Sequence, residues 1–213
     1  MSRKQTPLCT SLNKYCQPCG LRTRKGYLCW HHQRIDLGFR VKKINKLKGF
    51  GLVAEKDFKK DEFITTYDGK LLKPTPNDKF LEYGLGFELT KRPSAYFNNC
   101  FTRFGNTNPS EIKKLDKYFD EERKKNPGEP VPFDLNSTRT NMGYGRYLNA
   151  CDYKHKRIKK TCNVYIEDNI EEAYFNKCSK NIDLGCGPRI RAAKDIKKGE
   201  ELLFPYGSDY VWS

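Results

Sequence analysis

The sequence predicts a mainly β fold with few short helices. Short runs rich in β-branched and aromatic residues recur along the chain, for example FRVKKI at 39–44 and EFITTY at 62–67. Polar turns separate these runs, and helical spacing of apolar residues is clear in one stretch, 110–125. A short segment rich in cysteine and histidine precedes them. We therefore expect a body of short strands and hairpins behind a small N-terminal segment that has almost no core.

The N-terminal segment, residues 1–37, carries side chains that bind metal ions. Thiolates and imidazoles close together can complete a tetrahedral zinc site, and a segment without a core needs a metal for its folding energy. Cys16 and Cys19 have the spacing of a zinc knuckle, but the sequence does not choose between them. The candidate ligands of a structural zinc ion are Cys9, Cys16 or Cys19, Cys29 and His32. The alternative is a set of reduced cysteines in a flexible arm.

The net charge of +15 is concentrated near the N-terminus. Residues 1–60 hold 15 lysine and arginine residues against 3 acidic residues, whereas residues 61–213 hold 26 against 23. Concentrated positive charge suggests a polyanionic partner, so we expect this arm to contact DNA or a nucleosome. The alternative is the ordinary surface of a soluble, lysine-rich chain.

The sequence predicts neither a membrane span nor a secretory signal. No apolar run approaches 18 residues, and the N-terminal stretch contains no apolar h-region. A nuclear or cytoplasmic location is therefore expected, where disulfides are disfavoured. We interpret four later cysteines as buried apolar residues rather than as a second zinc site. They are Cys151, Cys162, Cys178 and Cys186.

One segment of the sequence occurs twice. AEKDFKKDEFITTYDG at 54–69 and AAKDIKKGEELLFPYG at 192–207 share their order of residues, 138 positions apart. Each copy reads as a strand, a polar turn and a second strand, so we expect two hairpins, with Gly199 at the tight point of the second turn. Each copy also contains a tyrosine near its end. We expect Tyr67 of the first copy to pack in the core, and Tyr206 is its counterpart in the second.

The region between the two copies mixes strands with one helix. Strands are expected within 79–89 and 161–168. A helix is expected over 110–125, with Ser110 as its N-cap, and the NPGEPVP segment at 126–132 ends it. The apolar face of this helix consists of Ile112, Leu115 and Phe119.

These patterns divide the chain into the Cys/His-rich basic segment, 1–37, and a body, 38–213, with an inserted, partly helical region at about 90–135. Four motifs of the body, in chain order, resemble the SET domain of protein lysine methyltransferases. They are Gly49-Phe50-Gly51, Tyr67-Asp68-Gly69, Arg146-Tyr147-Leu148-Asn149 and Glu201-Leu202-Leu203-Phe204-Pro205-Tyr206. The resemblance implies a SET-type β-fold. It also implies methyl transfer from S-adenosylmethionine to a protein lysine side chain, with a histone tail as the expected substrate.

The same resemblance implies roles for single residues. Tyr206 matches the catalytic tyrosine, whose hydroxyl can hold the lone pair of the substrate amine. Gly49 and Gly51 let the backbone approach the cofactor without a Cβ in the way. Asn149 matches the asparagine that holds the amino-acid end of the cofactor. The remaining cofactor-binding candidates are Phe50, Arg146, Tyr147, Ala150 and, over the adenine, Trp212 or Tyr210.

Four features depart from the family pattern, one of which is Cys151-Asp152 in place of the family's Ser-Cys pair. Ala150 stands where the family has a histidine, and Pro205 stands where it has an aspartate. The seven residues after Tyr206 contain no cysteine for a zinc-binding cap. These departures support an alternative function, that of a catalytically inactive SET-like zinc protein that binds nucleic acid or chromatin partners.

Overall fold

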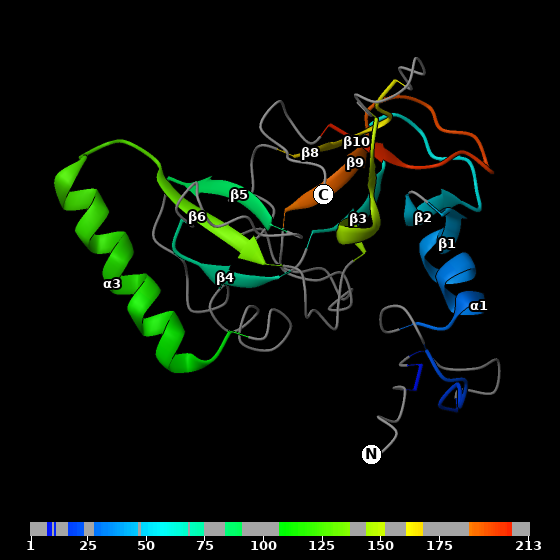
Figure 1. Cartoon of the computed structure of the whole chain (residues 1–213), viewed down its shortest axis with the longest axis horizontal. Coiled ribbons are helices and arrows are strands. Elements are labelled where there is room, and N and C mark those ends of the chain that lie inside the picture. Colours follow the sequence, from blue (N-terminus) through cyan, green and yellow to red (C-terminus); the bar gives the residue numbers. More distant parts are fainter. Residues whose placement is uncertain are drawn as a thin grey trace. The chain divides into compact units, whose positions relative to one another are not determined.

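The computed structural model confirms the mainly β fold, with short strands in several small sheets (Figure 1). It describes residues 8–9, 11, 17–23, 28–46, 48–67, 69–74, 84–90, 107–136, 144–151, 161–167 and 188–205. Among these residues, no helix is long and apolar enough to cross a membrane. The chain divides into two compact units. One consists of Met1–Thr65, Tyr147–Ile166 and Ile190–Ser213, and the other of Thr66–Arg146 and Glu167–Arg189. The boundary predicted after residue 37 stays a prediction.

The described strands that lie wholly or mostly in the first unit form three small sheets. Antiparallel strands β1 (Phe39–Asn45) and β2 (Gly49–Ala54) follow the short helix α1 (Trp30–His32) and the π-helical turn η1 (Gln33–Leu37). A second sheet has the order β3 (Phe63–Thr66), β9 (Arg189–Ala192) and β8 (Val164–Ile166). In the third, β10 (Leu203–Phe204) pairs in parallel with β7 (Asn149–Ala150), which comes soon after the 3-10 turn η3 (Gly145–Tyr147). The strands predicted at 39–44, 62–67 and within 161–168 are confirmed.

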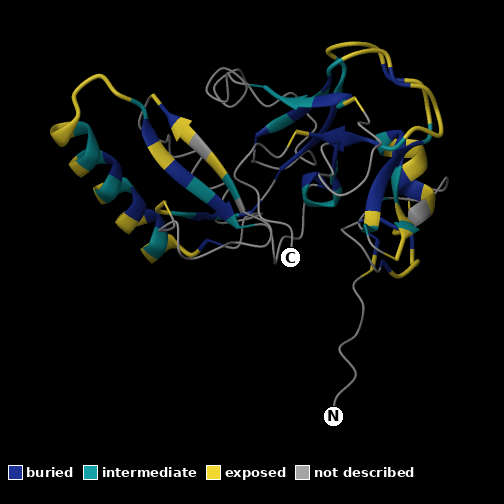
Figure 2. Cartoon of the chain, turned by 45° about the horizontal axis from the view of Figure 1, so that its top comes forward, coloured by how far each residue is buried: buried dark blue, intermediate teal, exposed yellow. Residues whose placement is uncertain are grey.

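The second unit packs one helix on a three-stranded antiparallel sheet. The sheet has the order β4 (Lys70–Leu72), β6 (Val131–Asn136) and β5 (Gly84–Leu89). Helix α3 (Pro109–Lys125) buries the predicted apolar face against this sheet. Figure 2 shows buried and exposed residues alternating along the helix. The N-cap is Asn108 rather than Ser110, because Asn108 and Glu111 form a reciprocal capping box with bonds of 2.9 and 3.0 Å.

The sequence analysis did not predict strand β6, whose first two residues fall in the segment expected to end the helix. Pro132 argues against a strand in the middle of a sheet, because proline has no N–H to donate. The ladder between β6 and β4 covers only Asp134 to Asn136, so Pro132 pairs with β5 alone, opposite Glu88. Pro132 therefore lies at a local edge of the sheet, where proline is tolerated.

The two copies of the repeated segment pair with each other instead of folding as two separate hairpins. The N–H of Phe58 donates to the carbonyl of Ile196, and the N–H of Ile196 donates back to the carbonyl of Phe58, both at 2.9 Å. Two further bonds in the same antiparallel order join Ala54 to Glu200 and Ala192 to Glu62, at 2.9 and 3.0 Å. The prediction of two hairpins was wrong because each copy finds its backbone partners in the other copy. We call this arrangement the reciprocal pair.

The turn side chains follow the same reciprocity. Asp57 accepts a hydrogen bond from the backbone N–H of Lys198 at 2.9 Å, and Asp195 accepts one from that of Lys60 at 3.0 Å. The carboxylate of Asp57 also pairs with the ammonium of Lys197 at 3.0 Å, and that of Asp195 pairs with the ammonium of Lys59 at 3.1 Å. The backbone N–H first, and the lysine second, hold the pKa of Asp57 and of Asp195 below the usual value.

Replacing Gly199 by alanine is expected to destabilise the reciprocal pair. Gly199 has a φ of 94°, and Asp61, at the same place in the first copy, has a φ of 65°. No atom lies within 4 Å of a Cβ built on Gly199, so the cost is that of an alanine at positive φ, about 1–2 kcal/mol. Asparagine tolerates this region better, so Gly199→Asn should lose less. Urea unfolding would measure both variants, and an alanine variant as stable as the wild type would contradict this account.

Candidate functional site

Segments far apart in the sequence meet around Gly51. Strand β2 begins at Gly49, whose φ of 66° lies in the region that favours glycine, and Gly51 follows as a buried residue. A Cβ on Gly51 would lie 2.5 Å from Nδ2 of Asn149 and 3.2 Å from Oε1 of Glu201. A side chain at this position would therefore have to displace the amide of Asn149. The structure therefore brings two of the predicted cofactor-binding residues, Gly51 and Asn149, into direct contact.

Asn149 is held between β2 and β10. Its Nδ2 donates to Oε1 of Glu201 at 2.8 Å and to the carbonyl of Phe50 at 3.4 Å. Its backbone lies in β7, which pairs with β10. Ala150, the next residue of β7, is buried. The two acceptors on one side of the amide leave Oδ1 of Asn149 directed to the other side.

The structure also describes four other residues that the sequence analysis singled out. Phe50 is 41% exposed, so its ring is accessible to a ligand. Arg146 and Tyr147 are half-buried in η3. Tyr67 is buried as predicted, and its Cα would lie 2.8 Å from a Cβ built on Gly145. Outside the described residues lie Cys16, Tyr206, Tyr210 and Trp212, whose roles stay predictions.

Four N-terminal side chains converge on one point. The sulfur atoms of Cys9, Cys19 and Cys29 and a ring nitrogen of His32 lie within 4.8 Å of one another, and all four residues are buried. Nδ1 of His32 is 3.3 Å from Sγ of Cys29 and 3.4 Å from Sγ of Cys9, and Sγ of Cys19 is 3.9 Å from that of Cys29. Ligand atoms around a tetrahedral zinc ion are about 3.5–3.8 Å apart, given bonds of about 2.3 Å to sulfur and about 2.0 Å to nitrogen. The cluster could therefore hold a metal ion.

The chemistry of the thiols in the cluster fits a site for a cation. The pKa values of the Cys9 and Cys29 thiols are shifted, and burial is the largest influence on each. Burial raises the pKa of Cys9. Burial also acts on Cys29, but hydrogen bonds from the backbone and ring of His32 outweigh it and lower the pKa, which favours the thiolate.

Gln33 donates to the carbonyl of Leu28 at 2.9 Å and accepts from the N–H of Val41 at 3.0 Å. The turn that carries Cys29 and His32 is thereby joined to β1.

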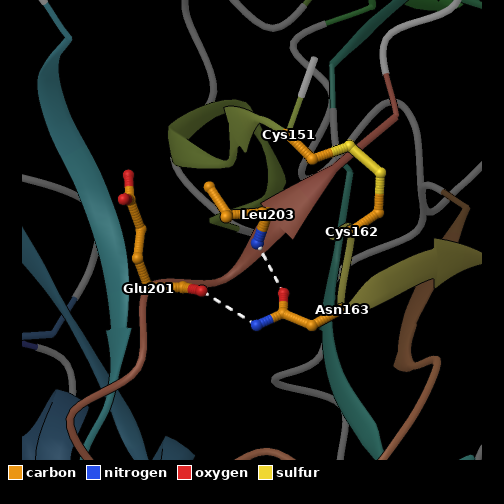
Figure 3. Close-up of a disulfide and its surroundings, with 5 residues drawn as sticks. All are labelled: Cys151, Cys162, Asn163, Glu201 and Leu203. Carbon is orange, nitrogen blue, oxygen red and sulfur yellow. Dashed lines mark hydrogen bonds between the residues drawn. A yellow bond between two sulfur atoms is a disulfide. The ribbon is translucent and has the colours of Figure 1, made fainter. Parts of the chain in front are cut away.

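Cys151 and Cys162 form a disulfide (Figure 3). The expectation of simple apolar packing is wrong for these two cysteines. Their Cα atoms lie 5.0 Å apart, because the end of β7 and the residues before β8 come together at β10. A sequence separation of 11 residues does not reveal this pairing. Cys178 and Cys186 lie outside the described residues.

Asn163, next to the disulfide, is a site residue that the sequence analysis missed. Its side chain is buried, and its Oδ1 accepts from the N–H of Leu203 at 2.7 Å (Figure 3). Its Nδ2 donates to the carbonyl of Glu201 at 2.9 Å. The segment that leads to Tyr206 is thus held by one amide side chain. The signal in the sequence is a polar residue at the start of an apolar strand.

Two comparisons with known proteins gave matches, and a third gave none. Among solved structures, the chain is similar to CpSET8 from Cryptosporidium, with 21% identity, a TM-score of 0.37 and a match over 80% of this chain. The match covers 57% of the length of that structure. A comparison with curated proteins gave no match. The family model of the SET domain matches residues 49–207, which include Gly51, Asn149 and the whole reciprocal pair. The chain therefore belongs to the SET domain family.

Proposed function

We propose that this protein is an S-adenosylmethionine-dependent protein lysine N-methyltransferase. The observation that carries the proposal is the meeting of Gly51, Asn149 and β10, which leads to Tyr206. Family membership supports the same reaction. The contact between Gly51 and Asn149 accounts for a glycine and an amide at two positions 98 residues apart in the sequence.

The residues present fit a cofactor with a charged amino-acid end. Oδ1 of Asn149 points away from its two acceptors, so it is oriented to accept from an ammonium group. The backbone at Gly49 and Gly51 allows close approach, and the exposed ring of Phe50 offers a face for packing. The bound cofactor would supply an electrophilic methyl group on its sulfonium.

The remaining chemistry belongs to the protein. Free lysine has a pKa of about 10.4, so the substrate amine must lose its proton before it can attack. An apolar channel disfavours the ammonium form and lines up the neutral amine. Tyr206, two residues after Phe204 of β10, would hold the amine through its hydroxyl.

Cofactor binding and methyl transfer test this proposal directly. At 100 times its dissociation constant, S-adenosylmethionine should stabilise the folded protein by about 2.7 kcal/mol. That corresponds to a melting temperature about 5–11 °C higher for a chain of this size. Labelled methyl transfer to core histones should fall roughly 100-fold in Tyr206→Phe, which should still bind the cofactor. A folded wild-type protein that the cofactor does not stabilise would contradict the proposal and favour the inactive zinc module.

We also propose histone tails as the substrate and chromatin as the location. Arg34 on η1, Lys42 and Lys43 on β1 and Lys46 just after β1 are exposed, which supports contact with a polyanion such as DNA. Methylation of nucleosomes should therefore decrease with salt more steeply than methylation of a free histone peptide. Equal salt dependence would remove the DNA contact and leave the methyltransferase proposal intact. In a reducing nucleus, Cys151 and Cys162 would be neighbouring thiols.

A further inference from the structure

Glu201 is a charged residue at the centre of the candidate site to which the sequence analysis gave no individual role. Its side chain is 9% exposed, and its backbone forms an isolated bridge with Val53 of β2. Figure 3 shows its carboxylate pointing away from Asn163, while its carbonyl accepts from Asn163. The carboxylate instead reaches Asn149 and Lys48.

The carboxylate determines which way the Asn149 amide faces. An ionised carboxylate can only accept hydrogen bonds, so the side of the amide that meets Glu201 must be the donating nitrogen. The 2.8 Å bond from Nδ2 of Asn149 has this geometry, and the carbonyl of Phe50 is a second, longer acceptor on the same side. Oδ1 is thereby kept on the opposite side as an acceptor.

Lys48 completes the arrangement. Its ammonium lies 3.3 Å from Oε2 of Glu201, and its side chain is 18% exposed. A nearly buried carboxylate is costly without a partner, and Lys48 provides the opposite charge. Lys48 also immediately precedes Gly49, so the ion pair links the glycine turn to the segment that enters β10.

We propose that Glu201 is a positioning residue for the cofactor: it fixes the Asn149 amide so that Oδ1 faces the ammonium of the amino-acid end. The inference rests on the proposed function, because it assumes that Asn149 binds that end. Glu201 acts through Asn149 and need not touch the cofactor. Loss of Glu201 should therefore weaken recognition of the amino-acid end and leave recognition of the nucleoside unchanged.

Two ligands separate this role from a general structural one. S-adenosylhomocysteine carries the amino-acid end, and 5′-methylthioadenosine lacks it. In Glu201→Gln, the new amide can donate as well as accept, so Asn149 is no longer held in one orientation. Calorimetric titration should give a dissociation constant for S-adenosylhomocysteine at least about tenfold weaker than the wild type. The constant for 5′-methylthioadenosine should change less than about twofold.

Controls distinguish the possible failures. Asn149→Ala should show the same selective loss, and adding Glu201→Gln to it should cause no further loss. If Glu201→Gln does not fold, Lys48→Met tests the same network and should give a smaller loss with the same selectivity. Equal weakening of both ligands, or none, would overturn the role of Glu201. A wild-type protein that binds neither ligand would instead overturn the proposed function.

Discussion

Replacing Cys29 by serine is expected to remove the metal from the N-terminal cluster and to unfold the residues around it. Cys29 is adjacent to both Cys19 and His32, so its loss opens the tetrahedron. Structural zinc sites contribute about 10–16 kcal/mol of binding free energy, and residues 1–35 have little else to stabilise them. Elemental analysis should find one zinc ion per wild-type chain and much less in the variant. A chelator should likewise remove hydrogen-exchange protection from residues 28–33 while the body stays folded.

The neighbouring cysteine of the same motif provides a matched control. Cys16→Ser should keep its zinc, because the cluster contains Cys19. A wild-type protein prepared with zinc that contains none would refute the metal assignment. Metal loss in Cys16→Ser with retention in Cys19→Ser would show that the other middle cysteine is the ligand.

Replacing Asn163 by alanine is expected to cause a large loss of stability. The variant would leave the N–H of Leu203 and the carbonyl of Glu201 without their side-chain partner in a buried environment. Each unsatisfied buried group costs about 1–3 kcal/mol, so the total is roughly 2–6 kcal/mol. Denaturant unfolding followed by circular dichroism would measure it.

An exposed asparagine separates this effect from the general cost of losing an amide. Asn45 accepts one hydrogen bond, from the N–H of Lys48 at 2.7 Å, and lies on the surface. Asn45→Ala should cost no more than about 1.5 kcal/mol, the upper range for one hydrogen bond that water can replace. Similar losses in the two variants would mean that Asn163 does not hold β10 in place.

Local patterns predicted several of the strands and the helix. The runs at 39–44 and 62–67 are β1 and β3, and the apolar spacing at 110–125 gives α3. Pairing was predicted poorly, because the partner of a strand depends on residues far away in the sequence. The reciprocal pair joins residues such as Phe58 and Ile196, which are 138 positions apart, and Pro132 is tolerated in β6 only because β4 is short.

The residues of the candidate site divide in the same way, into those that a local pattern predicts and those that depend on distant strands. Gly51 and Asn149 belong to sequence motifs, and the structure brings them into contact. Glu201 and Asn163 act through hydrogen bonds to distant strands, so no local pattern shows which groups they hold. The choice between Cys16 and Cys19 was equally open, since both fit the spacing and only the path of the backbone places a thiol beside Cys29.

The reciprocal pair has a consequence for the entropy of the chain. The N–H of Asp61 donates to the carbonyl of Ala192 at 2.8 Å, so the intervening residues form a closed loop. The entropic cost of closing a flexible loop rises slowly, by about 0.6 kcal/mol for each doubling of its length. Residues inserted in a connection between the helix and strands of this stretch should therefore cost little stability. A chain cut within the loop would give two fragments, each with one copy, that can recognise each other through the same backbone bonds.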